Sequence, residues 1–158
     1  GQHTGFRSST ITVLLFVFGI GSIVGNILGG YYADKNMNVT LYGALGSLVL
    51  SMLILFFLGK YPWFTGPWMF VVGAAGFSII SPLTSKLIDA ASSAPNLATT
   101  VNIAGFQLAN AVGAWIGSMS LSLGLGLGVL PLLGAVLALA AAVLLWVANT
   151  FTSNYETK

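Results

Sequence analysis

The chain has 158 residues, of which 56% are hydrophobic and only 5% are charged, and its formal net charge is +2. Because soluble domains carry about 25% charged residues, this chain could not cover its surface with groups that water solvates. It has no cysteine, which excludes disulfides, thiolate metal sites and cysteine nucleophiles. The mean hydropathy of +0.94 and the lack of a basic patch indicate a membrane protein with no nucleic-acid partner.

Long apolar runs separated by short polar stretches predict an all-α, polytopic membrane protein with five transmembrane helices. A span needs roughly 20 apolar residues, and in lipid a helix satisfies its own backbone hydrogen bonds. We expect a single domain over residues 1–158, with helices at about 10–33, 41–59, 68–88, 97–121 and 129–149.

The first apolar run contains three glycines at four-residue spacing, which places Gly21, Gly25 and Gly29 on one face of a helix. Small residues let a second membrane helix come close, so this face is predicted to pack against a neighbour. Asn26 borders the same face. We expect it to make a helix–helix hydrogen bond rather than a ligand contact, although it remains a candidate for the substrate path.

The third run carries a proline inside the expected helix. Pro82 removes one backbone donor, so a kink near Ser81–Pro82 is predicted. Ser78 can satisfy a carbonyl freed by the kink, and it is also a candidate for a polar substrate path.

The fourth run is amphipathic inside the membrane. Thr99, Asn102, Phe106 and Asn110 fall, together with two glycines, within an arc of about 80° on a helix. Amides facing lipid would cost several kcal/mol, so they must face protein or water. Two interpretations stay open: the amides hydrogen-bond to neighbouring helices, or they line a polar path for a substrate. The candidates for that path are Asn102, Phe106, Gln107 and Asn110, whereas Gly113 and Gly117 are expected to pack closely against another helix.

The titratable residues do not favour an enzyme. The three acids, Asp34, Asp89 and Glu156, lie at or beyond the ends of the expected helices, and the only histidine is His3 near the terminus. No carboxylate pair, metal-ligand cluster or nucleophile with a neighbouring base is present in a span. We therefore expect no catalytic site, no metal and no cofactor.

The segment from Gly30 to Lys35, GYYADK, resembles the loop motif of major facilitator superfamily transporters, in which a glycine and small residues precede Asp-Arg/Lys. The stretch 94–118 resembles helix eleven of the arabinose-efflux and drug:proton antiporter branch, and 78–88 would be helix ten. The loop-motif residues are Gly30, Asp34 and Lys35. The family motif continues with a glycine and two basic residues, and this sequence has Met37, Asn38 and Val39 there instead.

The resemblance implies a partial C-terminal half of a major facilitator fold, helices eight to twelve. It implies part of a secondary active transporter in the bacterial inner membrane, with proton-coupled efflux of sugars or drugs by alternating access. The implied partners are the lipid bilayer, the N-terminal half of the transporter, a small-molecule substrate and protons. Asp34 and Lys86 would lie on the cytoplasmic side.

The alternative is a small structural or pore-forming membrane protein that forms oligomers through its glycine faces. A start at Gly1 and an odd number of expected spans favour the transporter fragment.

Overall fold

The computed structural model describes residues 8–91 and 93–156, and these residues form helices joined by turns. This confirms the all-α class. The helices are α1 (Ser8–Ala33), α2 (Met37–Leu58), α3 (Pro62–Phe77), α4 (Ile80–Ala90), α5 (Pro95–Ser122), the short 3₁₀ helix η1 (Leu127–Val129) and α6 (Leu130–Glu156).

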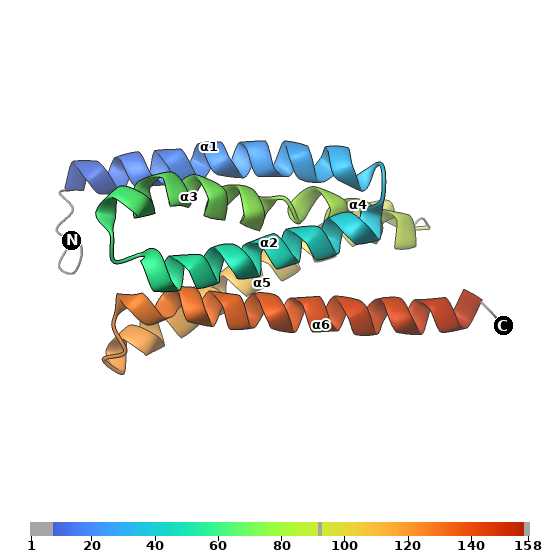
Figure 1. The fold of residues 1–158 in the computed structure, drawn as a ribbon. Helices are drawn as coiled ribbons and strands as arrows, with labels where there is room; N and C mark the ends of the chain where they lie inside the picture. Colours follow the sequence, from blue (N-terminus) through green and yellow to red (C-terminus); the bar gives the residue numbers. More distant parts are fainter. Residues whose placement is uncertain (1–7, 92, 157–158) are drawn as a thin grey trace.

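The long helices form a bundle in which neighbours along the chain are not always neighbours in space. The most extensive contact joins α1 to α3, and the next joins α2 to α6. Figure 1 shows α1 and α6 on opposite sides of the bundle, with α2 between them and α5 behind. The helix α4 continues the direction of α3 after a break, so α3 and α4 together extend along α1 (Figure 1).

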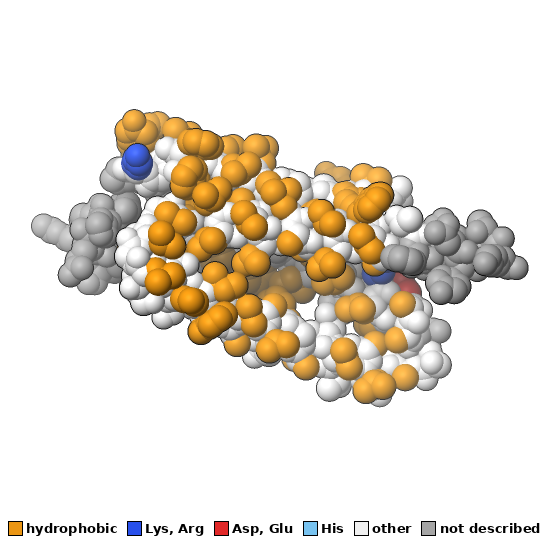
Figure 2. Space-filling view, turned by 90° about the horizontal axis from the view of Figure 1, so that it is seen from below, with side chains coloured by type: hydrophobic (Ala, Val, Ile, Leu, Met, Phe, Trp, Pro, Cys, Tyr) orange, Lys and Arg blue, Asp and Glu red, His pale blue; other side chains and the backbone are white. Residues whose placement is uncertain are grey.

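Four segments are long and apolar enough to cross a membrane: Thr12–Ala33, Met37–Leu58, Trp63–Ala90 and Leu127–Thr150. The fifth expected span is a helix of 28 residues, α5, but it is not among these four. Its amides and hydroxyls lower its hydropathy, so its passage through the membrane stays a prediction. Hydrophobic side chains cover most of the face drawn in Figure 2, and the coloured charges lie near its ends, as expected for a surface that meets lipid.

The second helix begins at Met37 rather than near residue 41. Asn36 explains the earlier start, because its side-chain oxygen accepts a hydrogen bond from the backbone N–H of Val39 at 3.1 Å. This N-cap satisfies one of the donors that a helix leaves free in its first turn. The last helix extends beyond residue 149, to Glu156.

The expected helix 68–88 is two helices, and the break lies before the expected Ser81–Pro82 kink. The helical hydrogen-bond pattern is interrupted at Ser78 and Ile79, although their φ and ψ angles stay in the right-handed helical region, and it resumes at Ile80. Pro82 has no N–H for the carbonyl of Ser78, and its ring crowds that carbonyl, so the interruption falls one turn ahead of the proline. The Ser78 hydroxyl donates to the carbonyl of Ala75 at 2.8 Å.

Candidate functional site: a groove between α4 and α5

A seam between α1 and α3 forms the fixed part of the bundle. If a Cβ were added at Gly21 or Gly25, it would overlap the backbone carbonyl of Phe70 or Ala74 in α3. A Cβ at Gly29 would overlap the carbonyl of Ser78, the residue that directly follows α3. The seam is reciprocal, because a Cβ at Gly73 would overlap the carbonyl of Phe18. Two helices that meet backbone to backbone have little freedom to shift, so α3 holds the start of α4 in place.

A cluster of polar side chains fastens the far part of α4 to α2 and α6. The ammonium of Lys86 donates to the side-chain oxygen of Asn38 at 3.0 Å and to that of Asn149. The Asn149 amide also donates to the hydroxyl of Tyr42 at 3.1 Å. We call these four residues the Lys86 cluster. The sequence did not predict this cluster, although Lys86 and Asn149 both fall in the last turn of an expected span.

The helix α5 is attached mainly to α4. The Asn102 amide donates to the hydroxyl of Thr84 at 3.0 Å, and α4 is the element that α5 contacts most. Most of α5 is otherwise exposed, including all residues from 103 to 115. Both its polar arc and its apolar side are therefore uncovered by the described chain.

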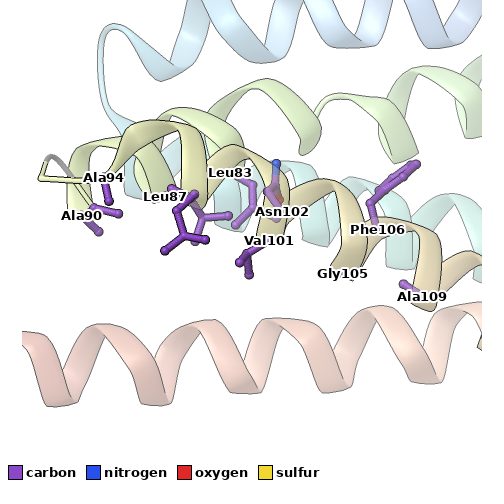
Figure 3. A pocket seen from close by; sticks show the side chains of 12 residues that line it. Leu83, Leu87, Ala90, Ala94, Val101, Asn102, Gly105, Phe106 and Ala109 are labelled. Atoms are coloured by element: carbon purple, nitrogen blue, oxygen red, sulfur yellow. The ribbon is translucent and has the colours of Figure 1, made fainter.

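A groove of about 670 Å³ lies in the angle between α4 and α5. Leu83 and Leu87 line it from α4, and Val101, Asn102 and Phe106 line it from α5, as Figure 3 shows. The remaining lining residues are alanines, a glycine and Leu97. Asn102 is the only amide on the wall. The groove can thus take a mainly apolar molecule of small-ligand size and offer it one hydrogen-bonding side chain.

The structure separates the candidates for the substrate path. Asn102 and Phe106 line the groove, whereas Gln107 and Asn110 do not. The last two are exposed, and the Asn110 amide donates to the Gln107 oxygen at 3.4 Å. Asn26 is also exposed, on α1, and Ser78 lies in the break between α3 and α4. Their proposed role in a path stays a prediction.

The loop-motif residues lie together at the end of α1. A Cβ at Gly30 would lie 3.0 Å from the hydroxyl oxygen of Ser81, so this glycine adjoins α4. Asp34 is exposed, and the ammonium of Lys35 lies 4.6 Å from the centre of the Tyr31 ring.

The two glycines of α5 that were expected to pack closely, Gly113 and Gly117, have open space beside them. No heavy atom beyond their own helix turn lies within 4 Å of the Cβ position at Gly113 or Gly117. Any close packing of this strip would need a partner outside the described residues.

No protein-family model matches the chain, and no solved structure matches it. Several curated proteins do match the chain. The chain is 39% identical over 136 residues to the inner membrane transport protein YdhP of Escherichia coli K12. This match covers 86% of this chain and 35% of YdhP. It is 30% identical over 157 residues to the uncharacterized MFS-type transporter YfhI of Bacillus subtilis, covering 99% of this chain and 38% of the relative. The purine ribonucleoside efflux pump NepI of Escherichia coli O6:H1 is 32% identical over 146 residues, 87% of this chain and 35% of the relative.

The chain therefore spans about 35% of the length of YdhP and of NepI. YdhP is named an inner membrane transport protein, and four helices of this chain suit a bilayer, which together support a multi-pass integral inner membrane protein. The resemblance seen in the loop motif extends over most of the chain, and we conclude that the chain is homologous to part of the major facilitator superfamily transporters.

Proposed function

We propose that the chain is part of a secondary active transporter that exports small molecules by alternating access. The observation that carries this proposal is the α4–α5 groove, an open, mainly apolar site with one amide, in a chain whose relatives are transporters. Binding sites of such transporters lie between two halves that rock against each other. In this proposal the groove is one wall of the site, and the part of the relatives' length that this chain does not span supplies the other.

The chemistry of the groove suits molecules with an apolar body and a few polar groups, which includes drugs and, with the amides of α5, sugars or nucleosides. The relative NepI is named a purine ribonucleoside efflux pump, which makes nucleosides a third class to test. Among the described residues, Asp34 follows the end of α1 and Asp89 lies in the last turn of α4, so neither lies near the middle of an apolar span. In a proton-coupled mechanism, the proton carrier would lie in the remaining length of the transporter.

The test uses the complete transporter in inside-out vesicles with an imposed pH gradient. Labelled guanosine, labelled arabinose and a cationic dye are offered separately, and gradient-dependent uptake of at least one is expected. Asn102→Leu should reduce that uptake, whereas Val112→Leu, outside the groove, should not. Vesicles that accumulate none of the three, or whose uptake ignores the gradient, would contradict a proton-coupled exporter of these classes.

Asp34 is proposed as a latch between the two halves of the transporter. It is exposed at the end of α1 and forms no ion pair with another described residue, so its charge is available to a partner. A helix N-terminus facing it would gain up to about 2 kcal/mol. Asp34→Asn in the complete transporter should slow transport at normal expression, and an unchanged rate would remove the latch.

The alternative, a structural or pore-forming oligomer, has lost one of its supports. The face of Gly21, Gly25 and Gly29 is already covered by α3, so it is not free to join a second copy. The α5 strip with Gly113 and Gly117 remains open for that role.

A further inference from the structure

A second groove, of about 300 Å³, opens between α1 and α2 near the turn that joins them. Leu28 and Gly29 line it from α1, and Val39 and Gly43 line it from α2. It exists because Gly29 is held against the carbonyl of Ser78, directly after α3, while Gly43 has no heavy atom within 4 Å of its Cβ position. The space above Gly43 is therefore not filled by any described side chain.

The serine and threonine hydroxyl groups on the wall of this groove already donate to backbone carbonyls of their own chain. Thr40 donates to the carbonyl of Asn36, Ser47 to that of Ala44 and Ser78 to that of Ala75, each at 2.8 Å. A bound molecule thus meets methyl, methylene and ring groups and finds few free donors. Such a wall suits a hydrocarbon chain better than a polar solute.

The mouth of the groove carries a positive charge. Tyr32 belongs to the groove wall, and the ammonium of Lys35 lies 5.8 Å from its ring centre and 4.6 Å from that of Tyr31. Within the described residues, Lys35 has no carboxylate within ion-pair distance, although Asp34 is its neighbour in the chain. The α2 helix also begins here, and its first turn presents the positive end of the helix dipole.

We propose that the α1–α2 groove is a phospholipid site, in which the phosphate meets Lys35 and one acyl chain enters the groove beside Gly43. The volume is near the lower end of the roughly 300–1,000 Å³ found for small-molecule pockets, which fits part of one chain rather than a whole lipid. The Asp34 carboxylate beside the lysine disfavours a headgroup with several negative charges, so the ligand is a phospholipid with a single phosphate. This proposal is independent of what the protein transports.

The site predicts two different patterns of loss, one for each part of the lipid. The protein is purified in its full length, and bound lipid is measured by native mass spectrometry. The probes are phosphatidylglycerol and diacylglycerol with identical acyl chains, which differ in the phosphoglycerol headgroup. Wild-type protein should retain phosphatidylglycerol in preference to diacylglycerol.

Lys35→Gln should lower phosphatidylglycerol retention about fivefold, the factor that one lysine near a lipid phosphate contributes, and leave diacylglycerol unchanged. The control is Lys60→Gln, an exposed lysine after the far end of α2. Because Lys35 is exposed, the substitution leaves the packing intact.

Gly43→Leu should fill the groove and reduce retention of both lipids. Its control, Gly46→Leu, lies on the same helix, is equally free of neighbours within 4 Å and does not line the groove. A phosphatidylglycerol that carries a photoreactive acyl chain should label residues 28–47 in wild type and in Gly46→Leu but not in Gly43→Leu.

Three results would overturn the site. They are equal retention of the two lipids by the wild type, unchanged retention in Gly43→Leu, and equal losses in Gly43→Leu and Gly46→Leu. Unchanged retention in Lys35→Gln would equally remove the phosphate contact. Label found only outside residues 28–47 would place the lipid elsewhere.

Discussion

The α1–α3 pair and the α4–α5 pair hold their helices together in opposite ways. Along α1 and α3, glycines at Gly21, Gly25, Gly29 and Gly73 let the two backbones touch. Between α4 and α5, one hydrogen bond from Asn102 to Thr84 and the sides of an open groove make most of the contact. In the α5 strip, the Cβ positions of Gly113 and Gly117 have no atom of another described helix within 4 Å.

The difference shows that glycines at four-residue spacing in a membrane helix do not always pack against another helix of the same chain. In lipid, close packing is driven by van der Waals contact, so a glycine matters only where a second backbone is present. The α1 strip has that backbone within this chain, whereas the α5 strip has none within it. We infer that α1 and α3 form the scaffold, whereas the α5 strip has no backbone packed against it among the described residues.

The largest expected effect comes from adding one methyl group to the glycine strip of α1, and the same change in the α5 strip is the comparison. Gly25→Ala puts a Cβ onto the carbonyl of Ala74, and neither backbone can yield without opening the seam. Overpacking of this kind costs about 3 kcal/mol, so the thermal unfolding midpoint of the purified protein should fall sharply. Gly113→Ala meets no atom within 4 Å and should leave the midpoint nearly unchanged. Equal midpoints for the two variants would abolish the distinction between the strips.

A smaller effect is expected at the Lys86 cluster, which fastens the α4–α5 pair to the rest of the bundle. Lys86→Met keeps the length of the side chain but removes the donors to Asn38 and Asn149. Hydrogen bonds to charged groups are worth about 1.5–3 kcal/mol, and the half-buried site keeps part of that value. The unfolding midpoint should fall by less than in Gly25→Ala, and α5 should become more sensitive to protease.

The matched control is Lys60→Met, an exposed lysine at the other end of α2. It should alter neither the midpoint nor the cleavage of α5. If both lysine variants behave alike, the cluster does not hold α4.

The all-α membrane class could be predicted from the sequence, because charge-free runs of span length leave few other structures possible. The helix that packs against each helix face could not be predicted. The spacing of Gly21, Gly25 and Gly29 indicates a face, but α3 rather than the adjoining α2 covers it, and that depends on the crossing of helices distant in sequence. The α1–α2 groove was missed for the same reason.

The ends of some helices also could not be predicted, because single side chains shift where a helix begins or is interrupted. Asn36 looks like part of a polar turn, yet it caps α2 and starts the helix earlier. Pro82 marks a kink, but its steric effect acts one turn back, at Ser78. For the site, the polar arc of α5 predicted Asn102 and Phe106 together with Gln107 and Asn110, and only the first two meet in the groove.

A still smaller effect is expected for the hydrogen bond that attaches α5. Asn102→Leu and Thr84→Val each remove one partner of the contact at 3.0 Å, and the double variant removes both. Such bonds between membrane helices contribute about 0.6 kcal/mol on average. A double-mutant cycle on the free energy of unfolding should therefore return a coupling free energy of that order. A coupling of zero would mean that α5 is held by its apolar contacts alone.

The smallest effect on stability is expected at Asn110, and there stability and transport should separate. Its amide is exposed and makes only a 3.4 Å contact with Gln107 on the same helix, so Asn110→Leu should change the free energy of unfolding by less than about 0.5 kcal/mol. If the arc faces a path for the substrate in the complete transporter, the same variant should still lower transport more than Val112→Leu does. Cysteines introduced at 110 and 112 add a direct measurement, since a water-soluble reagent should reach the first and not the second. Equal reaction at both positions, with equal transport, would mean that the polar arc of α5 serves packing against a partner and not passage of a substrate.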